Sequence, residues 1–156
     1  MDGGSENFET NYASKLTQVT EGEWAGWSCY PGGDPYEDLT GPFYFKVGDD
    51  GRPVCAFRAE RKHMNGGGFL HGGCAMTFAD FCLFVIAREA LQDSMSVTAT
   101  FNGEFVGTAH EGDLVTCTGE VVKAGRSMVF VRGLITTKGG EPVMPFSAVL
   151  KKRTKR

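Results

Sequence analysis

The chain has 156 residues, of which 41% are hydrophobic and 22% are charged, and its formal net charge is −3. This composition predicts one globular domain and excludes a disordered chain, because it supplies enough apolar surface for a core. Residues 1–30 have neither a basic start nor an apolar run, and the longest apolar run, residues 74–87, is too short to span a bilayer. We therefore expect a cytoplasmic protein without a membrane partner.

The cysteines and histidines show no pattern of a disulfide framework or a metal site. The five cysteines include no C-x-x-C pair, and His63, His71 and His110 lack the spacing of metal-binding motifs. Basic residues gather at the end of the sequence, but no groove-reading motif accompanies them. We expect reduced cysteines, no metal and no nucleic-acid partner, with residues 153–156 as a solvated basic tail.

Residues 1–40 form an N-terminal extension that is less regular than the rest of the sequence. Within it, residues 11–19 (NYASKLTQV) predict a short helix. Residues 24–42 (WAGWSCYPGGDPYEDLTGP) predict a loop in which the aromatic side chains serve as anchors. We expect this extension to lie outside the main domain.

The main domain, residues 41–152, has the pattern of one helix set among antiparallel strands. A hairpin over residues 42–60 opens it, with GDDG as the turn. Residues 74–91 are apolar nearly all round, which is typical of a helix buried in a core. We predict an α+β fold in which the hairpin and a four-strand meander wrap this helix. The meander strands are residues 95–105, 113–124, 127–137 and 142–152.

A glycine-rich loop, residues 66–73 (GGGFLHGG), leads into the predicted helix. Glycines permit close approach of a ligand to the backbone, and a helix N-terminus presents free N–H groups to an anion. The same glycines also suit a flexible turn or close packing, and the loop matches neither phosphate-binding fingerprint. The loop alone leaves both interpretations open.

Asp80 is the one acid in the apolar run of residues 74–87. A buried carboxylate is costly unless it is paired, and Thr77 is the only local side chain able to help. Asp80 therefore either pairs with a strand or interface group, or serves as a base or nucleophile. It lies eight residues beyond Gly72, roughly 12 Å along a helix, so one carbonyl cannot contact both residues of one chain. If both act, the site lies between two subunits.

The glycine loop, the residues before it and the acid after it share one spacing with a known family. That spacing is His63-x-Asn65-x-x-Gly68-x-x-His71-Gly72-Gly73, followed by Asp80. It resembles the signature of hotdog-fold acyl-CoA thioesterases of the phenylacetic-acid-degradation type. The resemblance implies an antiparallel sheet around one long buried helix, preceded here by an irregular extension. It also implies a homodimer, often paired into a homotetramer, with acyl-CoA as the substrate and no separate cofactor.

The resemblance implies a catalytic role for four residues. The Gly72 N–H polarises the thioester carbonyl, and Asp80 of the partner subunit acts as the nucleophile or as the general base for water. Asn65 positions the thioester or the water, and His71 supports the loop. This arrangement suits thioester hydrolysis, because N–H donors stabilise the oxyanion more than they stabilise the ground state.

The resemblance also implies a hydroxyl residue that faces the site from the strand after the helix. Thr98 takes this place, or Ser96 if the alignment shifts by two residues. The other substrate-binding residues that it implies are Gly73 and, toward the CoA phosphates, Lys123 and Arg126.

Two other functions suit the same fold. A non-catalytic acyl-CoA-binding or regulatory module would bind its ligand without turnover, although the presence of Asp80, Asn65 and Gly72 together favours catalysis. A dehydratase or hydratase usually relies on a different arrangement of histidine and acid. We therefore predict that the protein hydrolyses acyl-CoA to free acid and CoA.

Overall fold

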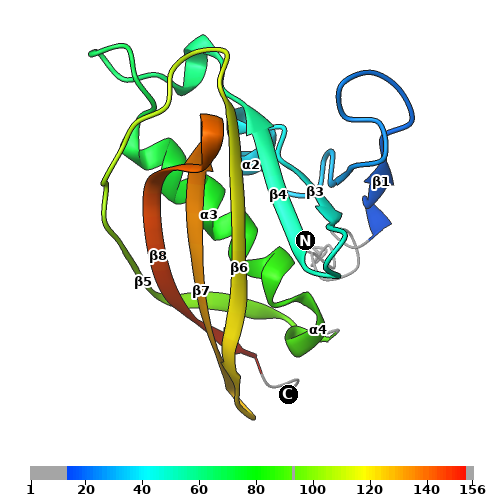
Figure 1. Ribbon diagram of the computed structural model, residues 1–156. Coiled ribbons are helices and arrows are strands. Elements are labelled where there is room, and N and C mark those ends of the chain that lie inside the picture. The colour runs from blue at the N-terminus through cyan, green and yellow to red at the C-terminus, as the bar shows by residue number, and fades with distance from the viewer. Residues whose placement is uncertain (1–13, 93, 154–156) are drawn as a thin grey trace, which may run out of the picture.

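The computed structural model describes residues 14–92 and 94–153, and its centre is one long helix, α3 (Gly72–Ile86). An eight-stranded antiparallel sheet curves around this helix, as predicted (Figure 1). The strands are β1 (Thr17–Gln18), β2 (Ser28–Cys29), β3 (Tyr44–Val47), β4 (Pro53–Arg58), β5 (Ser96–Gly103), β6 (Leu114–Ala124), β7 (Met128–Thr137) and β8 (Glu141–Lys152). The other helices are α2 (Pro35–Thr40), α4 (Arg88–Leu91) and the single turns η1 (Arg61–His63) and η2 (Lys138–Gly140).

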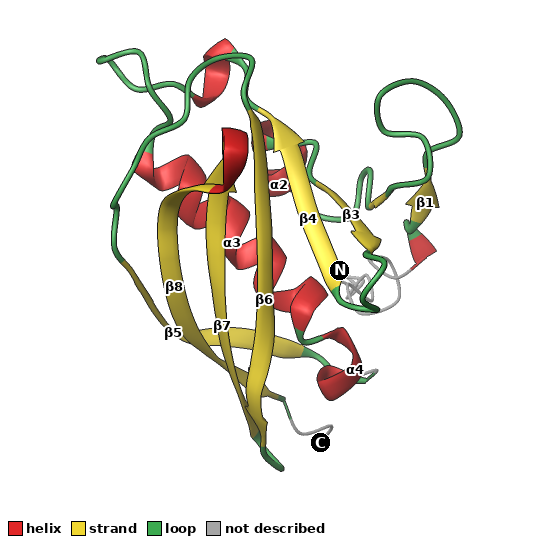
Figure 2. Cartoon of the chain, viewed as in Figure 1, coloured by secondary structure: helices red, strands yellow, loops and turns green. Residues whose placement is uncertain are grey.

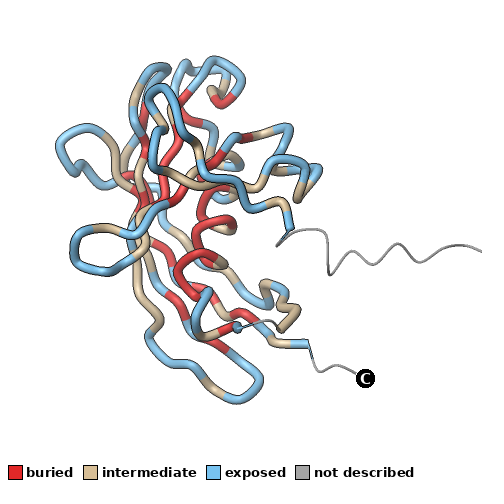
Figure 3. The backbone as a smooth tube through the Cα atoms, turned by 90° about the vertical axis from the view of Figure 1, so that its right-hand side faces the viewer, coloured by how far each residue is buried: buried red, intermediate tan, exposed pale blue. Residues whose placement is uncertain are grey.

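Helix α3 lies in the concave face of the sheet, where most of its length is buried (Figure 3). Phe78 and Leu83 are fully shielded from solvent, because apolar residues occupy almost the whole circumference of the helix. Gly119 of β6 allows the close approach, since a Cβ at this position would lie 2.7 Å from Ile86 Cδ1. The helix begins at Gly72, the start from which the distance to Asp80 was reckoned, and is followed by α4 after Ala87.

The strand order corrects the predicted four-strand meander. The sheet runs β1-β2-β3-β4-β6-β7-β8-β5, so of the four predicted meander strands only β6, β7 and β8 are consecutive neighbours, and β5 pairs with β8 at the edge. The connection over residues 104–113 is too long for a hairpin turn and crosses to the other side of β7 and β8. The Ala59 N–H donates to Asp113 O at 2.9 Å, which brings the chain to β4 rather than back along β5.

The N-terminal extension is more regular than the sequence indicated. The prediction of a loop over residues 24–42 is wrong, because this segment contains β2 and α2. Asp34 caps α2 and Pro35 is its first residue, both of which are ordinary helix-start signals. The predicted helix over residues 11–19 falls partly outside the described residues, and its Thr17–Gln18 portion is the strand β1.

Aromatic anchors hold the extension to the domain, as predicted. The Trp24 ring stacks on Tyr44 with a centroid separation of 4.1 Å, and the Tyr30 ring stacks on Phe45 at 5.5 Å. Helix α2 lies beside α3, behind β4 in the view of Figure 2. The extension therefore contributes both to the sheet and to the surroundings of the central helix.

All five cysteines are free thiols, and three of them are buried where α3 packs against β4 and β6. Within residues 14–92 and 94–153, no helix combines the length and apolar character needed to cross a membrane. The same part of the chain contains no cluster of three or more histidine, cysteine or acidic residues that would hold a metal ion.

Candidate active site

The start of α3 presents backbone donors without acceptors among the described residues, the N–H groups of Gly72 and Cys74. His71 is the N-cap residue, and its Nδ1 accepts a 2.8 Å hydrogen bond from the Gly73 N–H. This bond occupies the Gly73 donor and orients the imidazole. The Gly72 N–H meets no acceptor within the part of the chain that the structure describes. Of the two glycines, Gly72 is therefore the one whose N–H remains available to a ligand oxygen.

Asn65 shapes the loop that leads to this helix start. Its Oδ1 accepts from the Gly67 N–H at 2.8 Å and from the Phe69 N–H at 3.3 Å, while the Asn65 N–H donates to Phe69 O at 2.8 Å. A side chain that bonds its own loop in this way fixes the turn, as asparagine commonly does. The structure thus uses the carboxamide oxygen of Asn65 to build the loop.

His63 anchors the other end of the loop inside the protein. Its Nε2 donates to Thr40 O at 2.6 Å, and its Nδ1 accepts from the Glu60 N–H at 2.9 Å. This pair of bonds requires the neutral imidazole, and burial lowers the pKa of His63. The His71 N–H donates to His63 O at 2.8 Å, so the buried histidine also positions the cap of α3.

Asp80 is paired with a hydroxyl from β5. Thr98 Oγ1 donates a 2.6 Å hydrogen bond to Asp80 Oδ1, whereas Thr77, the expected local partner, bonds Gly73 O at 2.9 Å. Burial raises the pKa of the Asp80 carboxyl, the bond from Thr98 opposes this rise, and the nearby Asp34 carboxylate adds to it. Asp80 is thus a poorly solvated carboxylate with a single short side-chain hydrogen bond among the described residues.

A cavity of about 330 Å³ opens beside Asp80. Its walls come from α3, from β5 and from the segment that starts α2. The residues that line it are Asp34, Tyr36, Glu37, Met76, Thr77, Asp80 and Phe101. Sequence reasoning missed the first three, although Asp34-Pro35 is a recognisable helix start that would have placed an ordered element in this region.

The remaining predicted residues lie apart from this carboxylate. Ser96 Oγ donates to Ser94 O at 3.3 Å, so Thr98, and not Ser96, meets Asp80. Lys123 and Arg126 belong to the end of β6 and to the turn before β7, which Figure 1 shows at the end of the sheet far from the start of α3. Within one chain, the structure does not bring these two basic residues to Asp80.

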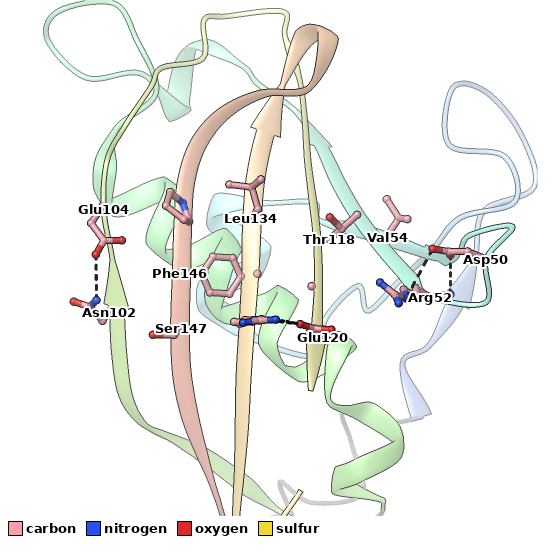
Figure 4. Close-up of a pocket in the computed structure, with 14 residues that line it drawn as sticks. Asp50, Arg52, Val54, Asn102, Glu104, Thr118, Glu120, Leu134, Phe146 and Ser147 are labelled. Atoms are coloured by element: carbon pink, nitrogen blue, oxygen red, sulfur yellow. Dashed lines mark hydrogen bonds and ion pairs between the residues drawn. The ribbon is translucent and has the colours of Figure 1, made fainter. Parts of the chain in front are cut away.

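A larger hollow of about 640 Å³ lies on the face of the sheet opposite α3 (Figure 4). Arg132 Nε donates to Glu120 Oε1 at 2.7 Å across this face. None of the predicted catalytic or substrate-binding residues lines the hollow. Of these two hollows, only the smaller cavity is lined by a predicted site residue, Asp80.

Comparisons with known proteins identify the family of the chain. Residues 67–144, which include the end of the loop, α3 and most of the sheet, match the model of the thioesterase superfamily. A candidate esterase of Pseudomonas aeruginosa is 35% identical over 97 residues, which are 62% of this chain and 72% of that protein. Human acyl-coenzyme A thioesterase 13 is 24% identical over 103 residues, covering 66% of this chain and 74% of the relative.

Solved structures show the same fold. A hypothetical thioesterase protein of Streptococcus pneumoniae, solved with coenzyme A, superposes with a TM-score of 0.65 at 21% identity over 73% of this chain and 88% of that one. The PaaI protein of the Escherichia coli phenylacetic acid degradation operon gives a TM-score of 0.65 at 20% identity, over 78% and 86% of the two chains. The chain belongs to the thioesterase superfamily and is a thioester hydrolase with the hotdog fold.

Proposed function

We propose that this protein hydrolyses acyl-CoA thioesters to the free acid and CoA. One observation carries the proposal. Asp80 is a poorly solvated carboxylate that accepts a hydrogen bond from Thr98 and lines a cavity, and the same helix begins with the Gly72 N–H, which meets no acceptor among the described residues. The superfamily membership supports thioester chemistry, and the Streptococcus relative that was solved with coenzyme A supports CoA as the thiol.

In the proposed reaction the Gly72 N–H donates to the carbonyl oxygen as negative charge develops on it. Asp80 takes a proton from water while the water oxygen attacks the carbonyl carbon, or the Asp80 carboxylate attacks that carbon itself and water hydrolyses the resulting anhydride. The C–S bond breaks, the sulfur leaves as the CoA thiolate, and the acid is released. Both routes require ionised Asp80, and a raised pKa makes the carboxylate a stronger base once it is ionised.

The site that we propose is shared between two subunits of a homodimer. Gly72 and Asp80 lie eight residues apart on one helix, or roughly 12 Å, so one carbonyl oxygen and its attacking group cannot meet both within a chain. Strand β5 is at the edge of the sheet, where a second copy can add its own β5. Phe105 and Val106, just after β5, are 57% and 58% exposed, as expected of side chains that a second subunit would cover.

The other predicted residues take supporting roles in this proposal. Asn65 and His71 hold the loop so that the Gly72 N–H points outward, and Thr98 fixes the orientation of the Asp80 carboxylate. We also propose that dimers pair into tetramers. In the assembled oligomer, the pantetheine and phosphate groups of CoA contact the remaining predicted residues, Gly73, Ser96, Lys123 and Arg126.

The assay measures CoA release from acyl-CoAs of several lengths and from phenylacetyl-CoA with a thiol reagent. We expect saturable hydrolysis by the wild type and a loss of about 10²–10⁴-fold in kcat for Asp80→Asn, the range for removal of a general base. Wild-type rates in a folded Asp80→Asn protein would show that the assigned role is wrong. Saturable binding without turnover would instead indicate a binding module.

A pair of variants at Gly72 tests the oxyanion donor. Gly72→Pro removes the N–H at the first helical position, where proline is well tolerated. Gly72→Ala keeps the N–H and is the matched control, because both variants place a Cβ 3.1 Å from the Phe105 ring. We expect a loss of about 10²–10³-fold in kcat for Gly72→Pro relative to Gly72→Ala. Equal rates for the two variants would exclude this N–H as the donor.

A further inference from the structure

One wall of the Asp80 cavity comes from the N-terminal extension. Asp34, Tyr36 and Glu37, at the start of α2, face Met76 and Asp80 of α3 across the cavity. Residues 67–144 are the part of the chain that matches the superfamily, so this wall lies outside the matched region. The wall is therefore contributed by a part of the chain that the superfamily match does not cover.

Hydrogen bonds hold this wall in place at both ends of α2. Asp34 Oδ1 accepts from the Tyr36 N–H at 2.9 Å and from the Glu37 N–H at 3.0 Å, which caps the helix. At the other end, Thr40 O accepts the bond from the buried His63 ring. A short helix of this kind has little stability of its own. The Asp34 bonds stabilise its first turn, and the bond from His63 holds its other end against the domain. Asp34 and Glu37 thus keep a defined position beside the cavity.

The charge of the lining residues is entirely negative. Three of the seven, Asp34, Glu37 and Asp80, carry carboxylates, and none of the seven is basic. The influence of Asp34 reaches the proposed reacting group, because its negative charge raises the pKa of Asp80. Met76 and Phe101 supply apolar contact surface in the same cavity. The lining therefore suits a neutral, apolar group and repels an anionic one.

We propose that Asp34 and Glu37 determine acyl-group specificity, admitting neutral acyl groups and rejecting acyl groups that carry an ionised terminal carboxylate. This inference rests on the proposed function, since a thioester whose carbonyl lies at Asp80 must place one of its two arms in this cavity. The acyl arm is the one that fits, because the CoA arm carries phosphates that three carboxylates would repel. The extension is thus a specificity element of the active site.

The test compares two substrates of similar length and different charge, pentanoyl-CoA and glutaryl-CoA. The readout is the kcat/KM for pentanoyl-CoA divided by the kcat/KM for glutaryl-CoA. This ratio cancels any general loss of activity in a variant. Wild type should prefer pentanoyl-CoA, and Asp34→Asn and Glu37→Gln should each reduce the ratio by about tenfold, the effect of one like charge at a partly solvated site. Asparagine also caps helices well, so Asp34→Asn preserves α2.

Asp38→Asn is the matched control. It removes the same charge from the same helix, but Asp38 accepts a bond from the Gly32 N–H and does not line the cavity. Its ratio should stay within about twofold of wild type, because screening weakens the more distant charge. A ratio unchanged in both Asp34→Asn and Glu37→Gln, or reduced equally in Asp38→Asn, would overturn the proposal.

Binding of non-hydrolysable thioether analogues of the same two substrates, measured by calorimetry, separates this inference from the proposed function. If wild type hydrolyses neither thioester, the proposed function fails. The dissociation constant of the glutaryl analogue divided by that of the pentanoyl analogue still measures how strongly the wall rejects an anion. A lower ratio in Asp34→Asn than in Asp38→Asn supports the inference in that case as well. Equal ratios in the two variants reject it.

Discussion

The Thr98 hydroxyl donates a 2.6 Å hydrogen bond to Asp80 Oδ1, which joins the edge strand β5 to the middle of α3. A donor to the charged form of a carboxyl stabilises that form, and here the bond opposes the effect of burial on the pKa of Asp80. The two residues are 18 positions apart in the sequence. Their contact therefore depends on how the sheet closes around the helix.

Replacement of Thr98 should move the pH dependence of the reaction. In Thr98→Val the carboxylate loses its donor, so the pKa of Asp80 rises further and the acid limb of kcat/KM shifts to higher pH. We also expect about a tenfold loss at neutral pH, since a hydrogen bond to a charged group contributes on the order of 1.5 kcal/mol. Thr98→Ser keeps the hydroxyl and should retain the wild-type profile. Identical acid limbs in the kcat/KM profiles of Thr98→Val and Thr98→Ser would contradict this role of the hydroxyl.

Neutralisation of Asp80 should stabilise the protein while it abolishes activity. Burial raises the pKa of Asp80 above its ordinary 3.8, so the folded state holds this proton more tightly than the unfolded state. Stability from this group is therefore lost as pH rises through the interval between the two pKa values, and the cost persists at neutral pH.

Asp80→Asn removes this cost. We expect the melting temperature at pH 7 to rise by no more than about 2–4 °C, because the side chain is partly solvated. The difference from wild type should narrow as the pH falls toward 3.8, the ordinary value. Thermal unfolding across this range checks the sign, with Asp49→Asn in an exposed turn as the control. A lower melting temperature for Asp80→Asn at pH 7 would contradict the prediction.

His63 should give the protein an opposite pH dependence. Burial lowers the pKa of His63 below its ordinary 6.5, so below that pH the unfolded chain binds a proton that the folded chain excludes. Stability from this residue is present above pH 6.5 and is lost as the pH falls toward the folded pKa. Protonation would also break the bond from the Glu60 N–H to Nδ1.

The measurement is the change in melting temperature between pH 7.5 and pH 5.5. His63→Gln, which cannot titrate, should have a lower melting temperature than wild type at pH 7.5 but a smaller decrease on acidification. His110→Gln is the control, because His110 lies in an exposed turn. A decrease of equal size in wild type and His63→Gln would show that the buried imidazole does not carry the pH dependence.

Mixed subunits test the shared site directly. A hybrid of an Asp80→Ala subunit and a Gly72→Pro subunit has one site with both residues intact and one site with neither. Random mixing makes half of the dimers hybrid, so about a quarter of wild-type activity should return from two inactive parents. Mass spectrometry of differently tagged chains confirms the exchange. No recovery after confirmed exchange would place both residues of a working site in one chain.

Local sequence patterns predicted most of the elements of this fold. The strands β6, β7 and β8 match their alternating apolar residues and glycine turns to within one residue at each end. Helix α3 was evident because a segment apolar on all sides has to be buried. These features depend on neighbouring residues, which a single sequence displays.

The features that the sequence did not predict depend on distant residues. Nothing within residues 95–105 indicates that β5 pairs with β8 instead of β6, because that choice is made by where the connection over residues 104–113 runs. Helix α2 has only six residues, too few for a periodic pattern, although Asp34 and Pro35 mark its start. The family resemblance placed Thr98 at the site, but no local pattern predicted its contact to Asp80, because that contact crosses from a strand to a helix.

The place of β5 in the sheet also determines when the site can assemble during synthesis. Its only strand partner in the described chain is β8, which follows two further strands in the sequence. On the ribosome, β5 emerges with no ladder to join, and long-range pairing of this kind forms late. Thr98 reaches Asp80 only after the last strand is complete, so a nascent chain that stops before β8 contains every proposed catalytic residue and no assembled site.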